Sequence, residues 1–155
     1  MYEFLVVIVA FSGLISGYLL SLIAPEELRQ GQYYFEMIRY VSLTLFILLV
    51  GSSLTESPII SASVVLLFFA LLYFTGYIGL FYLLSAGLII FLVQPYILAG
   101  GILLFLCGMA SASLLAVKYE KNEKIKNKTE LLLHTFKVYG WFLIIGLLPF
   151  LFSNL

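Results

Sequence analysis

The chain has 155 residues, of which 63% are hydrophobic and only 10% charged, and its mean hydropathy is +1.14. Soluble domains carry roughly a quarter charged residues, so this composition excludes a water-soluble globule and predicts a protein whose solvent is the lipid bilayer. Cys107 is the single cysteine, which excludes an internal disulfide. The formal net charge is zero, so the overall charge gives no attraction for nucleic acid.

The charges are distributed unevenly along the chain. Every lysine and arginine lies within residues 29–39 or 118–137, and residues 40–117 contain a single charge, Glu56. Because lysine and arginine near membrane helices mark the cytoplasmic side, the pattern predicts a multi-pass protein of the cell membrane with both basic segments on one face. An even number of spans must then separate the two segments.

The first apolar stretch predicts a membrane helix over residues 4–23. A signal peptide is a poorer interpretation, because no basic residue precedes the stretch and its apolar part is about twice too long.

A turn and a second helix follow. Pro25, with two glutamates behind it, favours the start of a short interfacial segment, and Gly31 allows the chain to turn. A second span is expected over residues 36–54, in a helix that begins near Gln32. Residues 24–35 then form a cytoplasmic loop.

Residues 59–93 contain no charge. As one helix they would be roughly 50 Å long, far more than a hydrocarbon core of about 30 Å, so the segment is expected to fold back near Gly76. This gives two short spans over residues 59–75 and 78–93, with a re-entrant pair as the alternative.

The last part of the chain predicts two more spans. Gln94-Pro95 marks a reversal, residues 96–117 form a fifth span and residues 136–152 a sixth, joined by a cytoplasmic loop over residues 118–135. The expected fold is an all-α integral membrane bundle of about six transmembrane helices, forming one domain over residues 1–155. Both termini are then outside the cell.

Small residues recur on one side of two of these helices, where another helix backbone could approach closely. The predicted packing or interface positions are Gly13, Gly17 and Ser21 in the first helix and Gly108, Ala112 and Ala116 in the fifth. Packing within the chain and contact with another subunit are both open interpretations.

Ionisable residues converge only at the cytoplasmic ends of the helices. The possible cytoplasmic-face site comprises Glu26, Glu27, Arg29, Glu36, Arg39 and His134. The spacing predicts helix-surface pairs between Glu36 and Arg39 and between Glu130 and His134. The lysines of Lys118 to Lys128 are expected to contact anionic headgroups, and a sharper hypothesis makes the glutamates ligands of a divalent cation, with His134 as acid or base.

Within the predicted spans the polar side chains are mainly hydroxyls, and the chain has no aspartate. They include Ser16, Ser42, Thr44, Ser61, Ser85 and Ser113. Such hydroxyls either bond to carbonyls of their own helix or line a path for a solute. No motif for a catalytic residue, cofactor, metal or nucleic acid is present, so the sequence predicts none of these.

The turn that links the first two helices also resembles a known pattern. Ile23-Ala24-Pro25-Glu26-Glu27-Leu28, followed by Gly31 and Tyr34-Phe35, is similar to a turn in small archaeal polytopic membrane proteins. The resemblance covers Ala24 to Phe35 and implies no activity.

Three functions therefore remain as hypotheses. The leading one is a non-enzymatic subunit or scaffold of a membrane complex, whose partners are the lipid bilayer and either a second copy or another membrane subunit. The alternative is a small permease or channel for a neutral or apolar solute. A third is a lipid-modifying membrane enzyme with its site at the cytoplasmic face.

Overall fold

The computed structural model describes residues 2–54 and 94–121 and the single positions 59, 62, 63, 66, 67, 70, 85, 130, 133, 134, 137 and 140. Its elements are α1 (Tyr2–Ile23), α2 (Pro25–Gln30), α3 (Gln32–Leu54), a short 3-10 turn η1 (Gln94–Tyr96) and α6 (Ile97–Lys121). Every residue assigned to an element in this described part is helical, so the prediction of an all-α fold is confirmed.

Three of these helices are long and apolar enough to cross a membrane, over Phe4–Ile23, Gln32–Ser53 and Ile97–Tyr119. They correspond to the spans predicted at residues 4–23, 36–54 and 96–117. The other three predicted spans, at residues 59–75, 78–93 and 136–152, lie outside the described residues apart from isolated positions. The described residues thus contain three candidate spans, which identify a membrane protein, and not the six that were predicted.

The turn between α1 and α3 is itself helical. Pro25 begins α2, where its missing N–H is not needed, and the Gly31 N–H donates a 2.8 Å hydrogen bond to the Glu27 carbonyl at its end. Leu28 is the buried residue of this short helix, which contacts α1, α3 and α6. Most of the segment predicted as a loop over residues 24–35 therefore belongs to α2 and to the first turn of α3.

The reversal predicted at Gln94-Pro95 falls on η1, from which α6 begins directly. At its other end α6 continues to Lys121, four residues beyond the predicted span, because lysine and glutamate, which make up three of these four residues, are good helix formers. The predicted loop over residues 118–135 was wrong in its first residues.

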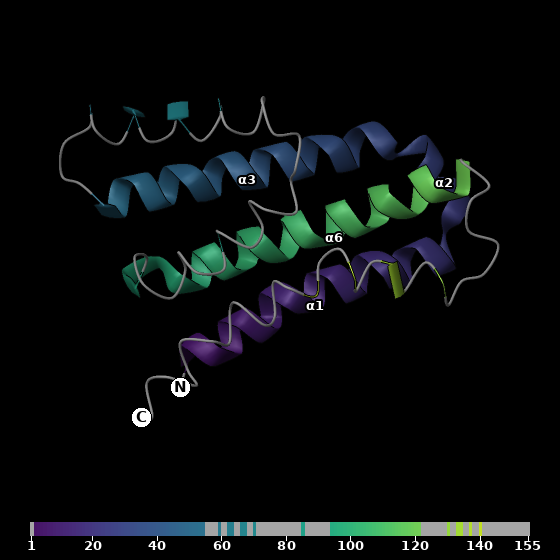
Figure 1. Ribbon diagram of the computed structural model, residues 1–155, viewed down its shortest axis with the longest axis horizontal. Helices are drawn as coiled ribbons and strands as arrows, with labels where there is room; N and C mark the ends of the chain where they lie inside the picture. Colours follow the sequence, from purple (N-terminus) through teal and green to yellow (C-terminus); the bar gives the residue numbers. More distant parts are fainter. Residues whose placement is uncertain are drawn as a thin grey trace.

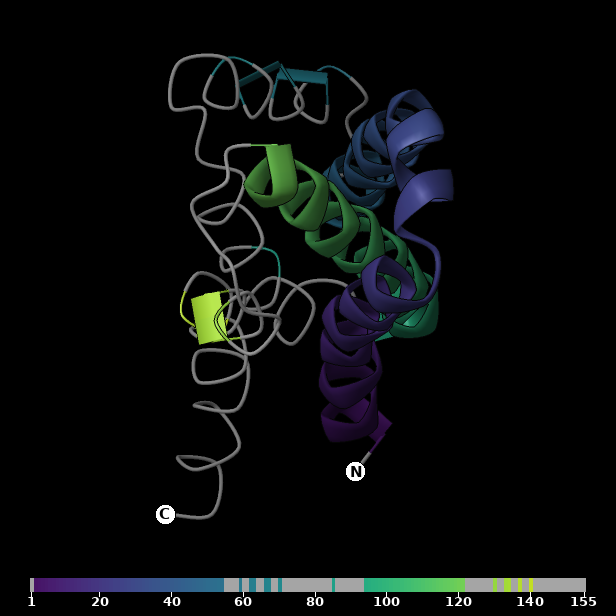
Figure 2. The same ribbon diagram turned by 90° about the vertical axis from the view of Figure 1, so that its right-hand side faces the viewer.

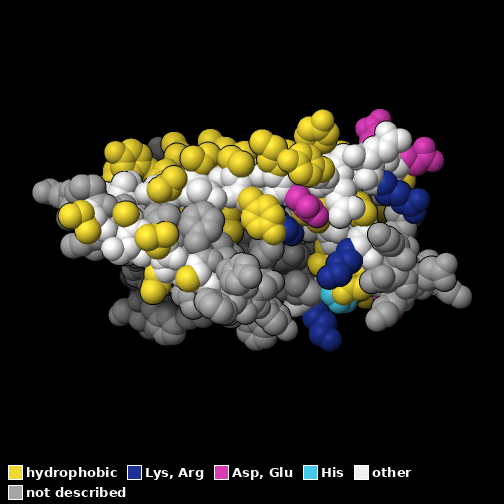
Figure 3. All heavy atoms as spheres, turned by 90° about the horizontal axis from the view of Figure 1, so that it is seen from above, with side chains coloured by type: hydrophobic (Ala, Val, Ile, Leu, Met, Phe, Trp, Pro, Cys, Tyr) yellow, Lys and Arg dark blue, Asp and Glu magenta, His cyan; other side chains and the backbone are white. Residues whose placement is uncertain are grey.

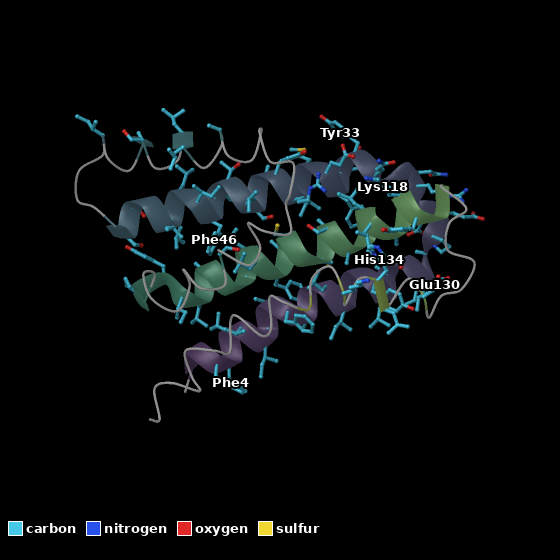
Figure 4. The ribbon with its side chains drawn as sticks, in the orientation of Figure 1. Phe4, Tyr33, Phe46, Lys118, Glu130 and His134 are labelled. Carbon is cyan, nitrogen blue, oxygen red and sulfur yellow. The ribbon has the colours of Figure 1, made fainter. Side chains whose placement is uncertain are left out.

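The long helices are arranged with α6 between α1 and α3, and α6 makes its most extensive contact with α1 (Figures 1 and 2). The core lies along these two contacts. It includes Val6, Ala10 and Leu14 of α1, Leu43, Phe46, Ile47 and Val50 of α3, and Leu104 and Cys107 of α6. Figure 4 shows Phe46 between α3 and α6 and Phe4 at the end of α1 that lies away from the labelled polar residues.

Candidate functional site

α1 approaches α6 most closely at two glycines, Gly13 and Gly17, which carry no side chain. A Cβ atom added at Gly13 would collide with backbone atoms of Phe105, including its Cα at 2.9 Å. One added at Gly17 would collide with the Met109 carbonyl and would lie 3.0 Å from the Cβ of Ala112. The two helices therefore touch backbone to backbone, which only glycine permits.

The remaining predicted packing residues lie along the same helices. Ala112 faces Gly17, and Gly108 and Ala116 are buried in α6. Ser21 is half-buried, and its hydroxyl donates a 2.6 Å hydrogen bond to the Tyr18 carbonyl of its own helix. The glycines of α1 and Ala112 of α6 are thus brought together within one chain.

One hydroxyl links the two helices. The buried Ser113 Oγ lies 2.9 Å from the Met109 carbonyl oxygen of its own helix and 3.3 Å from the Gly17 carbonyl oxygen of α1. Its single proton is shared between the two acceptors. The serine adds a polar contact at the level where the backbones are closest.

Most of the other described hydroxyls bond locally, as expected of serine and threonine in a membrane helix. Ser16 donates to the Ser12 carbonyl at 2.9 Å, Ser42 to the Arg39 carbonyl at 3.1 Å and Thr44 to the Tyr40 carbonyl at 2.7 Å. For these residues the interpretation of satisfied local bonds is confirmed. Ser61 lies outside the described residues.

The charged side chains that the structure describes gather at one end of the molecule (Figure 3). Glu26, Glu27 and Arg29 are exposed on α2, and Glu36 and Arg39 are half-buried in the first turns of α3. His134 lies at the same end, near Lys118 and Glu130 (Figure 4). Within the described ranges, no group of three His, Cys, Asp or Glu side chains is placed to hold a metal ion.

Both predicted helix-surface pairs at this end were wrong. Glu36 accepts a 3.3 Å hydrogen bond from the amide of Gln32 and makes no ion pair with Arg39. His134 makes none with Glu130: its Nε2 is hydrogen-bonded at 2.6 Å to the phenol oxygen of Tyr119 at the end of α6, and its Nδ1 is buried without a hydrogen-bond partner. The two rings are also in contact, with centroids 4.4 Å apart and planes tilted by 57°.

A small polar cluster between α3 and α6 is the feature that the sequence did not reveal. Ser42 of α3 and Ser111 of α6 are buried beside the thiol of Cys107, and Arg39 lies in the same neighbourhood. Ser42 lies one turn after Arg39, and Ser111 one turn after Cys107. The i,i+3 and i,i+4 spacings were visible in the sequence, but nothing in it indicated that these two faces meet.

An apolar groove lies at the other end of the α1–α6 contact. Its volume is about 160 Å³, and it is lined by Leu5, Val6, Val9, Leu98, Gly101 and Ile102. The exposed side chains of Leu5 and Leu98 at its edges suit contact with hydrocarbon. No polar residue is among those that line it.

No protein family, no curated protein and no solved structure matches the chain. The function is therefore argued from the residues themselves.

Proposed function

We propose that this chain is a non-enzymatic subunit or scaffold of a membrane complex. The observation that carries the proposal is that small and polar residues form the contact between α1 and α6. The glycines of α1 lie against the backbone of α6, and the hydroxyl of Ser113 spans the same contact. Contacts of this kind hold helices at a fixed distance, which is the property required of a rigid structural unit.

The same observation favours the subunit over the permease. A path for a neutral solute lined by serines would need their hydroxyls free to meet the solute. In α1 and α3 the hydroxyls of Ser16, Ser42 and Thr44 are bonded to carbonyls of their own helix. These groups support a structural role in helix packing.

The outer face of α3 is the surface we propose for the partner subunit. Of the three candidate spans α3 has the smallest buried share, 33% against 44% for α1 and 50% for α6. Val41, Leu45 and Leu48 are exposed along it. An apolar face of this extent is suited to lipid, to a second copy or to another membrane protein.

A test of the subunit proposal is the mass of the protein extracted from its own membrane in mild detergent. We expect native mass spectrometry to give a reproducible assembly heavier than the 17.4 kDa chain. A photo-crosslinking amino acid at Leu45, on the outer face of α3, should give a discrete product, while one at Ile15, on the outer face of α1, is the matched control. A monodisperse single chain with no product from either position would contradict the proposal, and solute flux in proteoliposomes would support the permease instead.

We also propose the complete topology of six spans, with the charged end in the cytoplasm and both termini outside. The proposal is supported by the described charged side chains, which gather at one end of the molecule (Figure 3). α1 ends and α3 begins at that same end (Figure 1).

Cysteine accessibility tests this topology without background, because Cys107 is fully buried. We expect an Asn154→Cys variant to react with an impermeant maleimide added to intact cells or spheroplasts, and an Asn122→Cys variant to react only after the membrane is opened. The reverse pattern would refute the orientation.

A further inference from the structure

No carboxylate among the described side chains forms an ion pair with Arg39. It lies seven residues after Gln32, which places it roughly 10 Å along α3 from the start of the helix. Its Nε atom is buried and has no hydrogen-bond partner, and its guanidinium carbon lies 4.9 Å from the centroid of the Tyr40 ring. Glu36, one turn earlier, is bonded to Gln32 instead.

A second unpaired donor lies in the same part of the α3–α6 contact. Ser111 is only 2% exposed, and its Oγ has no hydrogen-bond partner, unlike the other serines described in α1 and α6. It is linked to the arginine through Cys107, which lies beside Ser111 and within reach of the charge of Arg39. Two buried donors on neighbouring helices, the Arg39 Nε and the Ser111 Oγ, therefore lack an oxygen or nitrogen acceptor, and the Cys107 sulfur beside Ser111 is only a weak one.

The guanidinium of Arg39 and the hydroxyl of Ser111 would both be satisfied by the same kind of acceptor. An arginine near the hydrocarbon boundary is costly unless it meets an anion, and a buried hydroxyl is costly unless it is hydrogen-bonded. An oxygen-rich anion satisfies both, and arginine binds phosphate oxygens through paired, charge-assisted hydrogen bonds. Lys118 is exposed at the same end (Figure 4) and makes no ion pair with a described side chain, so the local field also attracts an anion.

We propose that Arg39 and Ser111 form a binding site for the phosphate group of an anionic phospholipid. The lipid is the favoured source because Arg39 lies within a candidate membrane span, in the third of it nearest the charged end, where a bound phosphate would have acyl chains beside it. Arg39 is partly exposed, so its outer nitrogens receive the phosphate first, and Ser111 is reached as the headgroup settles between α3 and α6. The inference is independent of the subunit role.

The test is a binding titration of the purified full-length protein, followed by native mass spectrometry. The probes are phosphatidylglycerol, a diacyl glycolipid with the same chains and no phosphate, and glycerol 3-phosphate, which has the phosphate and no chains. We expect phosphatidylglycerol to bind about tenfold more tightly than the glycolipid. Tight binding of glycerol 3-phosphate would support phosphate recognition and assign it to a soluble ligand, and weak binding of it would assign the site to the lipid headgroup.

The matched variants are Arg39→Gln and Arg29→Gln, which each remove one positive charge from the same end. Arg39→Gln should weaken phosphatidylglycerol binding about tenfold or more, whereas Arg29→Gln, on the exposed surface of α2, should change it little. Ser111→Ala should have a smaller effect in the same direction. Arg39→Lys keeps the charge and loses the paired hydrogen bonds, so its affinity for phosphatidylglycerol should lie between those of the wild type and of Arg39→Gln. If the glutamine variant does not fold, weaker binding by Arg39→Lys than by the wild type is the result that supports the site.

Equal weakening by Arg39→Gln and Arg29→Gln would overturn the proposal, because it would show general attraction to a charged end. Equal binding of the glycolipid and of phosphatidylglycerol would overturn it as well.

Discussion

Replacing Gly17 with alanine is expected to lower the free energy of unfolding by about 3 kcal/mol, because α1 and α6 must move apart to admit one methyl group. The new Cβ would lie 2.9 Å from the carbonyl carbon of Met109, whereas ordinary van der Waals contact begins near 3.4 Å. The obstacle is backbone, which cannot rotate away. Gly13→Ala should act in the same way against Phe105. The measurement is unfolding in mixed detergent micelles, followed by circular dichroism.

The chain supplies its own control for this substitution. A Cβ added at Gly140 would meet nothing within 4 Å. Alanine is the better helix former by about 1 kcal/mol, so Gly140→Ala should leave the stability unchanged or raise it slightly. If Gly17→Ala and Gly140→Ala had the same effect, the close approach of α1 and α6 would be wrong.

Leu104→Ala is the second substitution with a large expected effect. Leu104 is completely buried on α6, and truncating its side chain leaves a cavity in the core formed by the three long helices. We expect a loss of about 3 kcal/mol. In a bilayer most of this comes from lost dispersion contacts, because the lipid offers an apolar side chain nearly the same environment as the core.

The matched control is Leu98→Ala, the same change on the same helix at a side chain that is 69% exposed. Its effect should stay within about 0.5 kcal/mol. The same micelle unfolding assay compares the two variants. A larger loss at Leu98 than at Leu104 would mean that α6 presents the opposite face to the core.

Much of the fold followed from the sequence because the determining signals are local. The apolar run and Pro25 locate the end of α1, which is at Ile23, and Gln94-Pro95 marks the start of the next described helix. The small residues at Gly13 and Gly17 are visible from their four-residue spacing. Their partner on α6 was not, because spacing within one helix says nothing about which other helix it meets.

The interactions at the charged end were harder to predict, because they depend on how the helices meet. The spacing of Glu36 and Arg39 favours a pair, yet the guanidinium lies against Tyr40 and its Nε is buried. The bond between Tyr119 and His134 joins residues from two segments, and sequence patterns describe only one at a time. Ser111 and Ser113 likewise look alike in the sequence, yet Ser113 bonds carbonyls of its own helix and of α1 and Ser111 bonds neither.

The backbone contact between Gly13 and Phe105 also has a consequence for the order of biosynthesis. These residues are 92 positions apart (105 minus 13), which a ribosome needs roughly 5 to 20 s to translate. Once α1 has left the ribosome, its glycine face has to wait for α6, and such a face readily accepts another helix. A pause in translation before α6 emerges should therefore favour pairing of α1 with a neighbouring chain, and rapid synthesis should favour the native contact.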